Sequence, residues 1–119
     1  MCNRLSPEKA VIWDIIHSGR IYHDLADRLK ASHFTHRPYR RIFRICETLY
    51  RSGGTVTPEA FDEVARSMGY RFDLRDRRAL DRMLRQPPQA RMVANVSRLA
   101  QAMIDLQSAG RADLEILAN

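Results

Sequence analysis

Arginine side chains that could bind phosphate groups or acidic side chains recur between residues 37 and 51. The whole chain carries eighteen arginines, two lysines and a formal net charge of +6, so its field attracts nucleic acid or acidic proteins. Solvent-facing arginines are also typical of any amphipathic helix, so the alternative is that this face is only exposed to solvent and binds no partner. The candidate residues for a nucleic-acid or acidic-partner face are Arg37, Arg40, Arg41, Arg44 and Arg51.

Four histidines are the only residues whose number could suggest a metal site. His33 and His36 are three residues apart, but they precede Pro38 in an expected loop, and no second cluster lies at a ligand spacing. Cys2 and Cys46 are too few and too far apart to complete a metal site or to form a disulfide framework. We therefore expect no bound metal.

Catalytic and nucleotide-binding motifs are missing from the sequence. Gly53-Gly54 is followed by threonine and valine, without the lysine that a phosphate-binding loop places against its nucleotide. Asp62 and Glu63 are adjacent on an expected helix and face different directions, so they do not form an acid–base pair. No nucleophile motif links the serine, histidine and aspartate residues. We expect neither an enzyme nor a cofactor.

The arginines belong to the segment around which the rest of the chain is organised. Residues 38–51 have apolar side chains at three- and four-residue spacing, which predicts an amphipathic helix. Gly53-Gly54 ends it, because glycine adopts the left-handed conformation that helix ends often need. We expect Phe34 to pack beside the start of this helix. The apolar stripe consists of Tyr39, Ile42, Ile45, Cys46, Leu49 and Tyr50.

Length and composition indicate one helical domain. A chain of 119 residues with 45% hydrophobic residues can bury a modest core, and 29% charged residues are typical of globular proteins. No apolar run approaches the ~20 residues of a membrane helix, and residues 1–7 lack a signal-peptide core, so the expected location is the cytoplasm.

The fold class expected from periodicity and breaker residues is all-α, a compact bundle of about six helices. The bundle is expected to span residues 1–110, and residues 111–119 are expected to form a short helical tail. Capping residues and Gly or Pro breaks delimit the segments. The expected helices are residues 7–18, Ile21–Lys30, Pro38–Arg51, residues 58–68, Leu74–Leu84, Gln89–Ser108 and Arg111–Leu117.

Two sets of apolar residues could contact a partner. Trp13, on the first helix, either packs in the core or faces a partner. The segment after residue 89 has more apolar positions than one bundle helix needs, which suggests self-association. The candidate self-association residues are Met92, Met103, Ile104, Leu114 and Leu117.

The segment from Phe34 to Met68 resembles the N-terminal domain of the replicative DNA helicase DnaB. The shared pattern is Phe34, a short polar step, His36-Arg37, then Ile42-Phe43, a Gly-rich turn and a second capped helix. The family pattern is D-F-Y-x-x-x-H-x-x-I-F. The family usually has a small residue at the place of Trp13 and a Gly-Gly before the helix at residue 74, so the resemblance is weaker there.

The resemblance implies a non-catalytic interaction module of DNA replication. Its implied partners are a replicative helicase, primase or helicase loader, or further copies of the chain, and its implied mechanism is docking and assembly control. The helicase-binding domain of primase is thought to share this fold, so a resemblance to that domain is an alternative. The alternative function is a small basic DNA-binding regulator, in which Ile21–Lys30 and Pro38–Arg51 form a helix-turn-helix.

Overall fold

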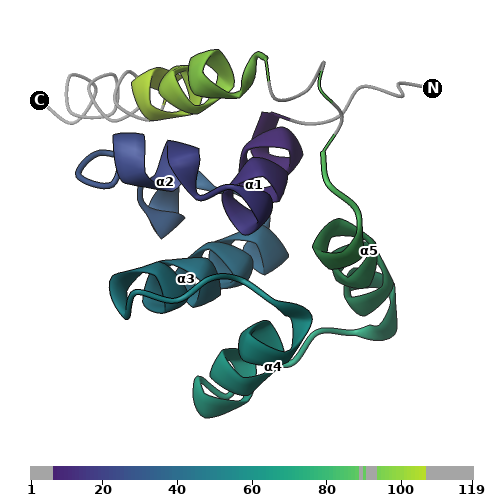
Figure 1. Cartoon of the computed structure of the whole chain (residues 1–119). Helices are drawn as coiled ribbons and strands as arrows, with labels where there is room; N and C mark the ends of the chain where they lie inside the picture. The colour runs from purple at the N-terminus through teal and green to yellow at the C-terminus, as the bar shows by residue number, and fades with distance from the viewer. Residues whose placement is uncertain (1–6, 89, 91–93, 107–119) are drawn as a thin grey trace, which may run out of the picture.

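Helices form all the regular secondary structure among the residues that the computed structural model describes, which are 7–88, 90 and 94–106. Figure 1 shows these helices gathered around a common interior. Since this part of the chain has no strand, the prediction of an all-α bundle is confirmed. The elements in chain order are α1 (Pro7–His17), α2 (Arg20–Asp24), the 3₁₀ helix η1 (Ala31–His33), α3 (Arg37–Arg51), α4 (Pro58–Ser67), α5 (Leu74–Arg85) and the helical residues 96–106.

Helix α3 is the central element, as its sequence pattern predicts. It contacts α1, η1 and α4, and its apolar face lies in the core. Phe34 is fully buried, and its ring centroid lies 5.4 Å from that of Phe43, so the expected packing at the start of α3 is confirmed. The buried residues of α3 are Ile42, Phe43, Ile45, Cys46 and Leu49.

The first turn of α1 is joined to the start of α3 through one carboxylate. Glu8 Oε1 accepts hydrogen bonds from the backbone N–H groups of Thr35 at 2.9 Å and His36 at 3.1 Å. The Thr35 hydroxyl donates to Glu8 Oε2 at 2.6 Å. The carboxylate thus satisfies two backbone donors just before α3 begins, where a helix does not supply acceptors itself.

The second helix is shorter than its periodicity predicts. The expected helix Ile21–Lys30 is wrong: α2 ends at Asp24, turns follow through residue 28, and the unpredicted η1 comes before α3. Leu25 and Leu29 are buried, but Ala26 is exposed. Both leucines therefore pack in the core although the residues between them form a turn. The apolar spacing that predicted a helix is explained by this turn.

A glycine brings α1 and α3 close together. Gly19 precedes α2 with φ +63°, and a β-carbon built there would lie 2.8 Å from Cζ of Tyr50. The Tyr50 ring stacks on Tyr22 with centroids 5.5 Å apart, and its hydroxyl donates to the backbone oxygen of Ile15. Tyr50 can reach α1 because residue 19 has no side chain.

Helices α4 and α5 are capped at their first residues and joined to each other by an ion pair. Their caps follow local rules, since Thr57 and Asp73 accept hydrogen bonds from the N–H groups three residues later, at 3.1 and 2.8 Å. Between the helices, Arg77 donates to both carboxylate oxygens of Asp62, at 2.8 and 3.0 Å. Phe61 and Ala65 of α4 are buried, whereas Met68, which follows the helix, is 36% exposed.

The last described helix lies across α1 and α2, as Figure 1 shows. Within the described residues, Gln89–Ser108 is not one continuous helix, because residues 94 and 95 form a turn before residues 96–106. Arg28 donates to the Gln101 side chain at 3.2 Å across this contact. The expected tail from residue 111 lies outside the described residues.

Candidate functional site

The arginines of α3 are divided between internal contacts and solvent. Arg40 Nη1 lies 3.4 Å from the backbone oxygens of both Phe34 and Thr35, and it donates to these carbonyls. Its guanidinium therefore holds the segment that leads into α3. This contact is a structural role that the sequence analysis did not predict.

Two further arginines bind the segment that follows α4. Arg41 donates to the backbone oxygen of Arg71 at 2.9 Å, and its guanidinium carbon lies 5.3 Å from the Tyr70 ring centroid. Arg44 donates to the Tyr70 hydroxyl at 3.5 Å. These contacts join α3 to the loop between α4 and α5. Two members of the predicted face therefore act within the fold.

The two remaining arginines of the predicted face lie at opposite ends of α3. Arg37 is exposed at the first residue of the helix. Arg51 is exposed at its last residue and pairs with Glu47 at 3.4 Å. A helix of 15 residues is about 22 Å long, so the five arginines do not form one compact site.

The helix-turn-helix alternative is wrong in its geometry. Its first helix, Ile21–Lys30, is replaced by the five-residue α2, and residues 25–36 separate α2 from α3. A helix-turn-helix needs two helices joined by a short turn, so that the second is held against the groove. The structure lacks that arrangement in this stretch.

Trp13 is part of a contact between α1 and the end of α5. Its side chain is partly buried against the core, and its indole N–H donates to the backbone oxygen of Gln86 at 2.7 Å. The ammonium group of Lys9 lies 5.9 Å from the ring centroid. Of the two roles left open by the sequence, these contacts favour packing within the chain over contact with a partner.

The candidate self-association residues require a correction. Met103 and Ile104 are each only 9% exposed and belong to the core of a single copy, so they present little surface to another chain. Met92, Leu114 and Leu117 lie outside the described residues. Leu106, which the sequence analysis did not select, is 76% exposed on the same helix. The available signal was its position two residues after Ile104, within the predicted helix Gln89–Ser108.

The histidines make separate contacts within the bundle. His17 Nε2 lies against the backbone oxygen of Met83, and the His36 ring lies 4.6 Å from the Tyr39 ring. His33 Nδ1 accepts from the Lys30 N–H at 3.0 Å. Among the described residues, no group of three or more potential ligands is arranged to hold a metal ion.

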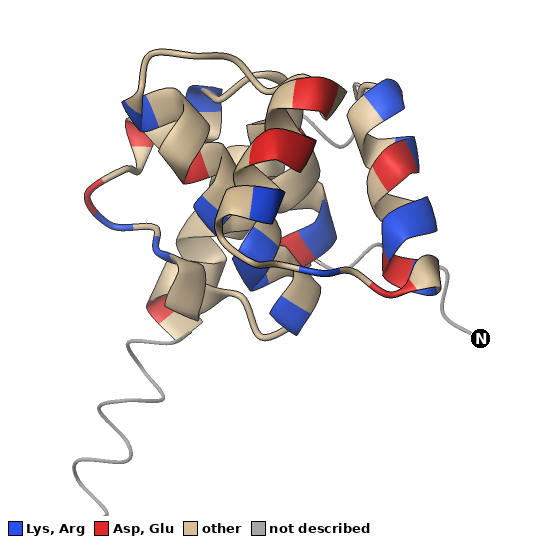
Figure 2. Ribbon diagram, turned by 90° about the horizontal axis from the view of Figure 1, so that it is seen from below, with Lys and Arg blue, Asp and Glu red and all other residues tan. Residues whose placement is uncertain are grey.

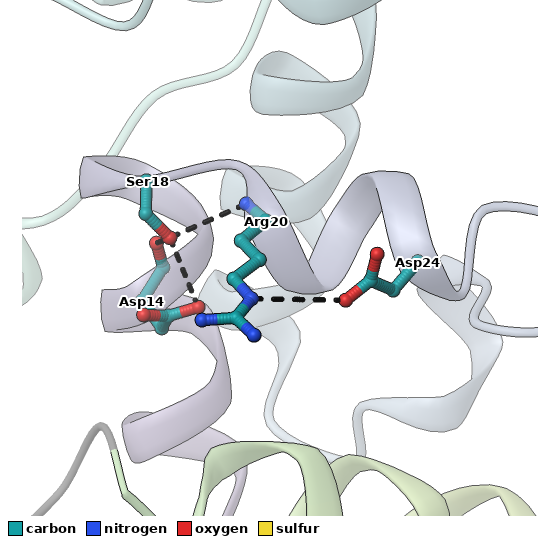
Figure 3. A network of polar contacts seen from close by, with 4 residues as sticks. All are labelled: Asp14, Ser18, Arg20 and Asp24. Atoms are coloured by element: carbon teal, nitrogen blue, oxygen red, sulfur yellow. Dashed lines mark hydrogen bonds and ion pairs between the residues drawn. The ribbon is translucent and has the colours of Figure 1, made fainter.

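A buried carboxylate in α1 is a feature that the sequence analysis missed. Asp14 is 4% exposed, and its Oδ2 accepts a hydrogen bond from the Ser18 hydroxyl at 3.1 Å (Figure 3). Ser18 Oγ also accepts from the Arg20 N–H at 3.3 Å, and Arg20 Nε lies 4.0 Å from Asp24. The available signal was position 14 itself, which falls three residues after Val11 on the apolar face of the helix.

Burial raises the pKa of Asp14, while the Ser18 hydrogen bond and the charges of Arg20 and His17 oppose that shift. Because the folded chain holds the Asp14 proton more tightly than the unfolded chain, stability falls as pH rises from the ordinary pKa of 3.8 toward the raised value. We expect Asp14→Asn to increase the free energy of unfolding at neutral pH, since it removes a buried charge and keeps an acceptor for Ser18.

Urea unfolding of Asp14→Asn and the parent chain at about pH 4 and about pH 7 tests this expectation. The gain should be larger at the higher pH. Asp24→Asn is the matched control, because Asp24 is exposed and its pair with Arg20 is weak. A loss of stability in Asp14→Asn at neutral pH would contradict the expectation.

Fold and motif together define a class of protein. An all-α domain centred on α3, with Phe34 and Phe43 packed at the start of that helix, is what the resemblance to helicase N-terminal domains predicts. The family model of the DnaB-like helicase N terminal domain matches residues 2–105 of the 119. The chain belongs to this family. No match was found among curated proteins or among solved structures.

Within the described ranges, none of the helices has both the length and the apolar character needed to cross a membrane. The helices described above instead contribute apolar side chains to a common core, and Figure 2 shows where lysines, arginines, aspartates and glutamates occur along them.

Proposed function

We propose that the chain is a non-catalytic docking module of DNA replication. It binds a replicative helicase, primase or helicase loader in a primosome-like assembly, or it binds further copies of itself. The observation that carries this proposal is the family match over residues 2–105, which spans most of the chain. The proposal includes action by assembly control rather than by chemistry, and a cytoplasmic location.

The absence of a phosphate-binding loop from the sequence supports a docking role. The internal use of Arg40, Arg41 and Arg44 supports it as well, because these side chains stabilise the fold around α3. A duplex-binding regulator that depended on this face would need the same guanidinium groups for phosphates. We therefore favour a protein partner over duplex DNA for the main function.

A pull-down with the full chain tests the docking proposal. The bait is incubated with nuclease-treated lysate of its source cell at moderate salt, and captured proteins are identified by mass spectrometry. We expect enrichment of a replicative helicase, primase or helicase loader over a bait unfolded by Phe34→Ala. Recovery of none of these proteins with the folded bait would overturn the proposal.

Self-association, if it is part of the function, should depend on Leu106. Leu106 is 76% exposed on the last described helix, so its apolar side chain is in contact with water. Covering it with a partner would be favourable. We expect Leu106→Glu, and separately deletion of residues 111–119, to shift the chain toward monomer in sedimentation velocity. The deletion tests the candidates Leu114 and Leu117.

Leu74→Glu is the matched control for Leu106→Glu. Leu74 is 68% exposed at the start of α5, so the change in charge and in exposed apolar area is similar. This control should keep the parent sedimentation coefficient. If the parent chain is oligomeric and Leu106→Glu leaves its mass unchanged, the proposed surface is wrong.

A further inference from the structure

A surface pocket between α4 and α5 combines aromatic rings with arginines. Its volume is about 350 Å³, and the loop between the two helices contributes two rings to it. The Phe72 ring lies 6.3 Å from that of Phe61 in the core, so the loop is fixed to the bundle by its aromatic residues. The lining residues are Asp62, Ala65, Arg66, Tyr70, Phe72 and Arg77.

The charged residues around the pocket are mostly arginines, and some of them are exposed to solvent. Asp62 is neutralised by its two hydrogen bonds with Arg77, which lower the pKa of the Asp62 carboxyl. Arg66 lines the pocket and is exposed, and Arg71, which lies between Tyr70 and Phe72 in the chain, is exposed as well. The Arg71 backbone is held by α3, whereas its side chain faces solvent. The pocket therefore combines the paired Asp62 and Arg77 with the exposed Arg66.

The arrangement in space brings these arginines together from three segments. Arg41 and Arg44 of α3 reach Tyr70, and Arg66 follows on the last turn of α4. The arginines near Tyr70 thus include Arg41 and Arg44 of the predicted face, together with Arg66, which that face did not include.

We propose that this pocket binds single-stranded nucleic acid. Proteins that hold single strands without reading their sequence combine a basic track for the phosphates with aromatic rings on which bases stack. Tyr70 and Phe72 supply the rings, and Arg66 and Arg71 supply the positive charge. An acidic peptide would use the arginines but not the rings, and bases paired in a duplex cannot reach them.

Fluorescence anisotropy with the full chain and a labelled oligothymidylate of about 20 nucleotides tests the proposal. We expect binding at low salt that weakens steeply as salt is added. Arg66→Glu with Arg71→Glu should weaken binding about tenfold or more and reduce the salt slope by about 1 to 2. Loss of binding together with an unchanged melting temperature would support the proposal.

Arg82→Glu with Arg85→Glu is the charge-matched control. Both residues are exposed on the last turn of α5, away from the first turns that line the pocket. This control should weaken binding much less than the pocket pair. Equal losses in the two double variants would mean a general effect of net charge, and the proposed site would be wrong.

Phe72→Leu separates stacking from charge, because leucine keeps an apolar contact with Phe61 but removes the ring. We expect about fivefold or more weaker binding of the single strand with an unchanged salt slope. Equal or tighter binding of a duplex of the same length would overturn the proposal. Tighter binding of a poly-glutamate peptide than of the single strand would also overturn the proposal if Arg66→Glu with Arg71→Glu abolished that binding. The pocket would then be assigned to an acidic protein.

This site is independent of the proposed docking function. A chain that recovers helicase or primase but does not bind the oligonucleotide loses only the single-strand site. A chain that binds the oligonucleotide through Phe72 but recovers none of those proteins keeps the site and loses the docking proposal.

Discussion

Phe34→Ala is expected to lower the free energy of unfolding by about 3–5 kcal/mol, the usual cost of removing a buried phenylalanine side chain. Phe34 is fully buried and packs on Phe43, so its removal opens a cavity where η1, α3 and the core meet. Domains of this kind are stable by about 5–15 kcal/mol, and the loss is a large part of that. The variant should be unfolded or close to it at growth temperature.

Urea titration followed by fluorescence measures this effect, since Trp13 is the single tryptophan and is partly buried. Leu74→Ala is the control, because Leu74 is 68% exposed and should change stability by only about 0.5 kcal/mol. A Phe34→Ala chain as stable as Leu74→Ala would show that residue 34 is not packed as described.

Gly19→Ala is expected to lower the free energy of unfolding by about 2 kcal/mol or more. Part of the cost is the left-handed backbone, with φ +63°, which costs an L-residue about 1–2 kcal/mol. The rest arises because the new methyl group would lie 2.8 Å from Cζ of Tyr50. Relief of that clash would move a ring that stacks on Tyr22 and binds the Ile15 carbonyl.

Gly53→Ala separates the two costs. Gly53 has φ +82°, but nothing lies within 4 Å of a β-carbon built on it, so only the backbone cost applies. We expect Gly19→Ala to be the more destabilising of the two in parallel urea titrations. Equal midpoints would mean that Tyr50 moves without cost, and the close approach of α1 and α3 would be unimportant for stability.

The sequence predicts the elements whose signals are local. The bounds of α3 differ from the expected Pro38–Arg51 by one residue, and the cap at Thr57 and the glycine after α4 lie where their types indicate. A polar cap or a proline in the first turn acts within three or four residues, so neighbouring sequence contains the information. Fold class follows from the same periodicity.

The sequence does not predict features that depend on distant residues. The Ile21–Lys30 pattern is satisfied by a turn because Leu25 and Leu29 reach the core without a helix. The internal contacts of Arg41 depend on Tyr70 and Arg71, thirty residues later. Helical spacing places an arginine on an outer face, but it gives no information about which loop lies against that face.

Contacts between the two ends of the bundle have a consequence for synthesis on the ribosome. Trp13 binds Gln86, and Arg28 binds Gln101, so each pair is 73 residues apart in the sequence. At about 5–20 residues per second, α1 has been translated for roughly 4–15 s before these partners are made. Its apolar face, with Val11, Ile12 and Ile15, therefore has no complete core during that interval.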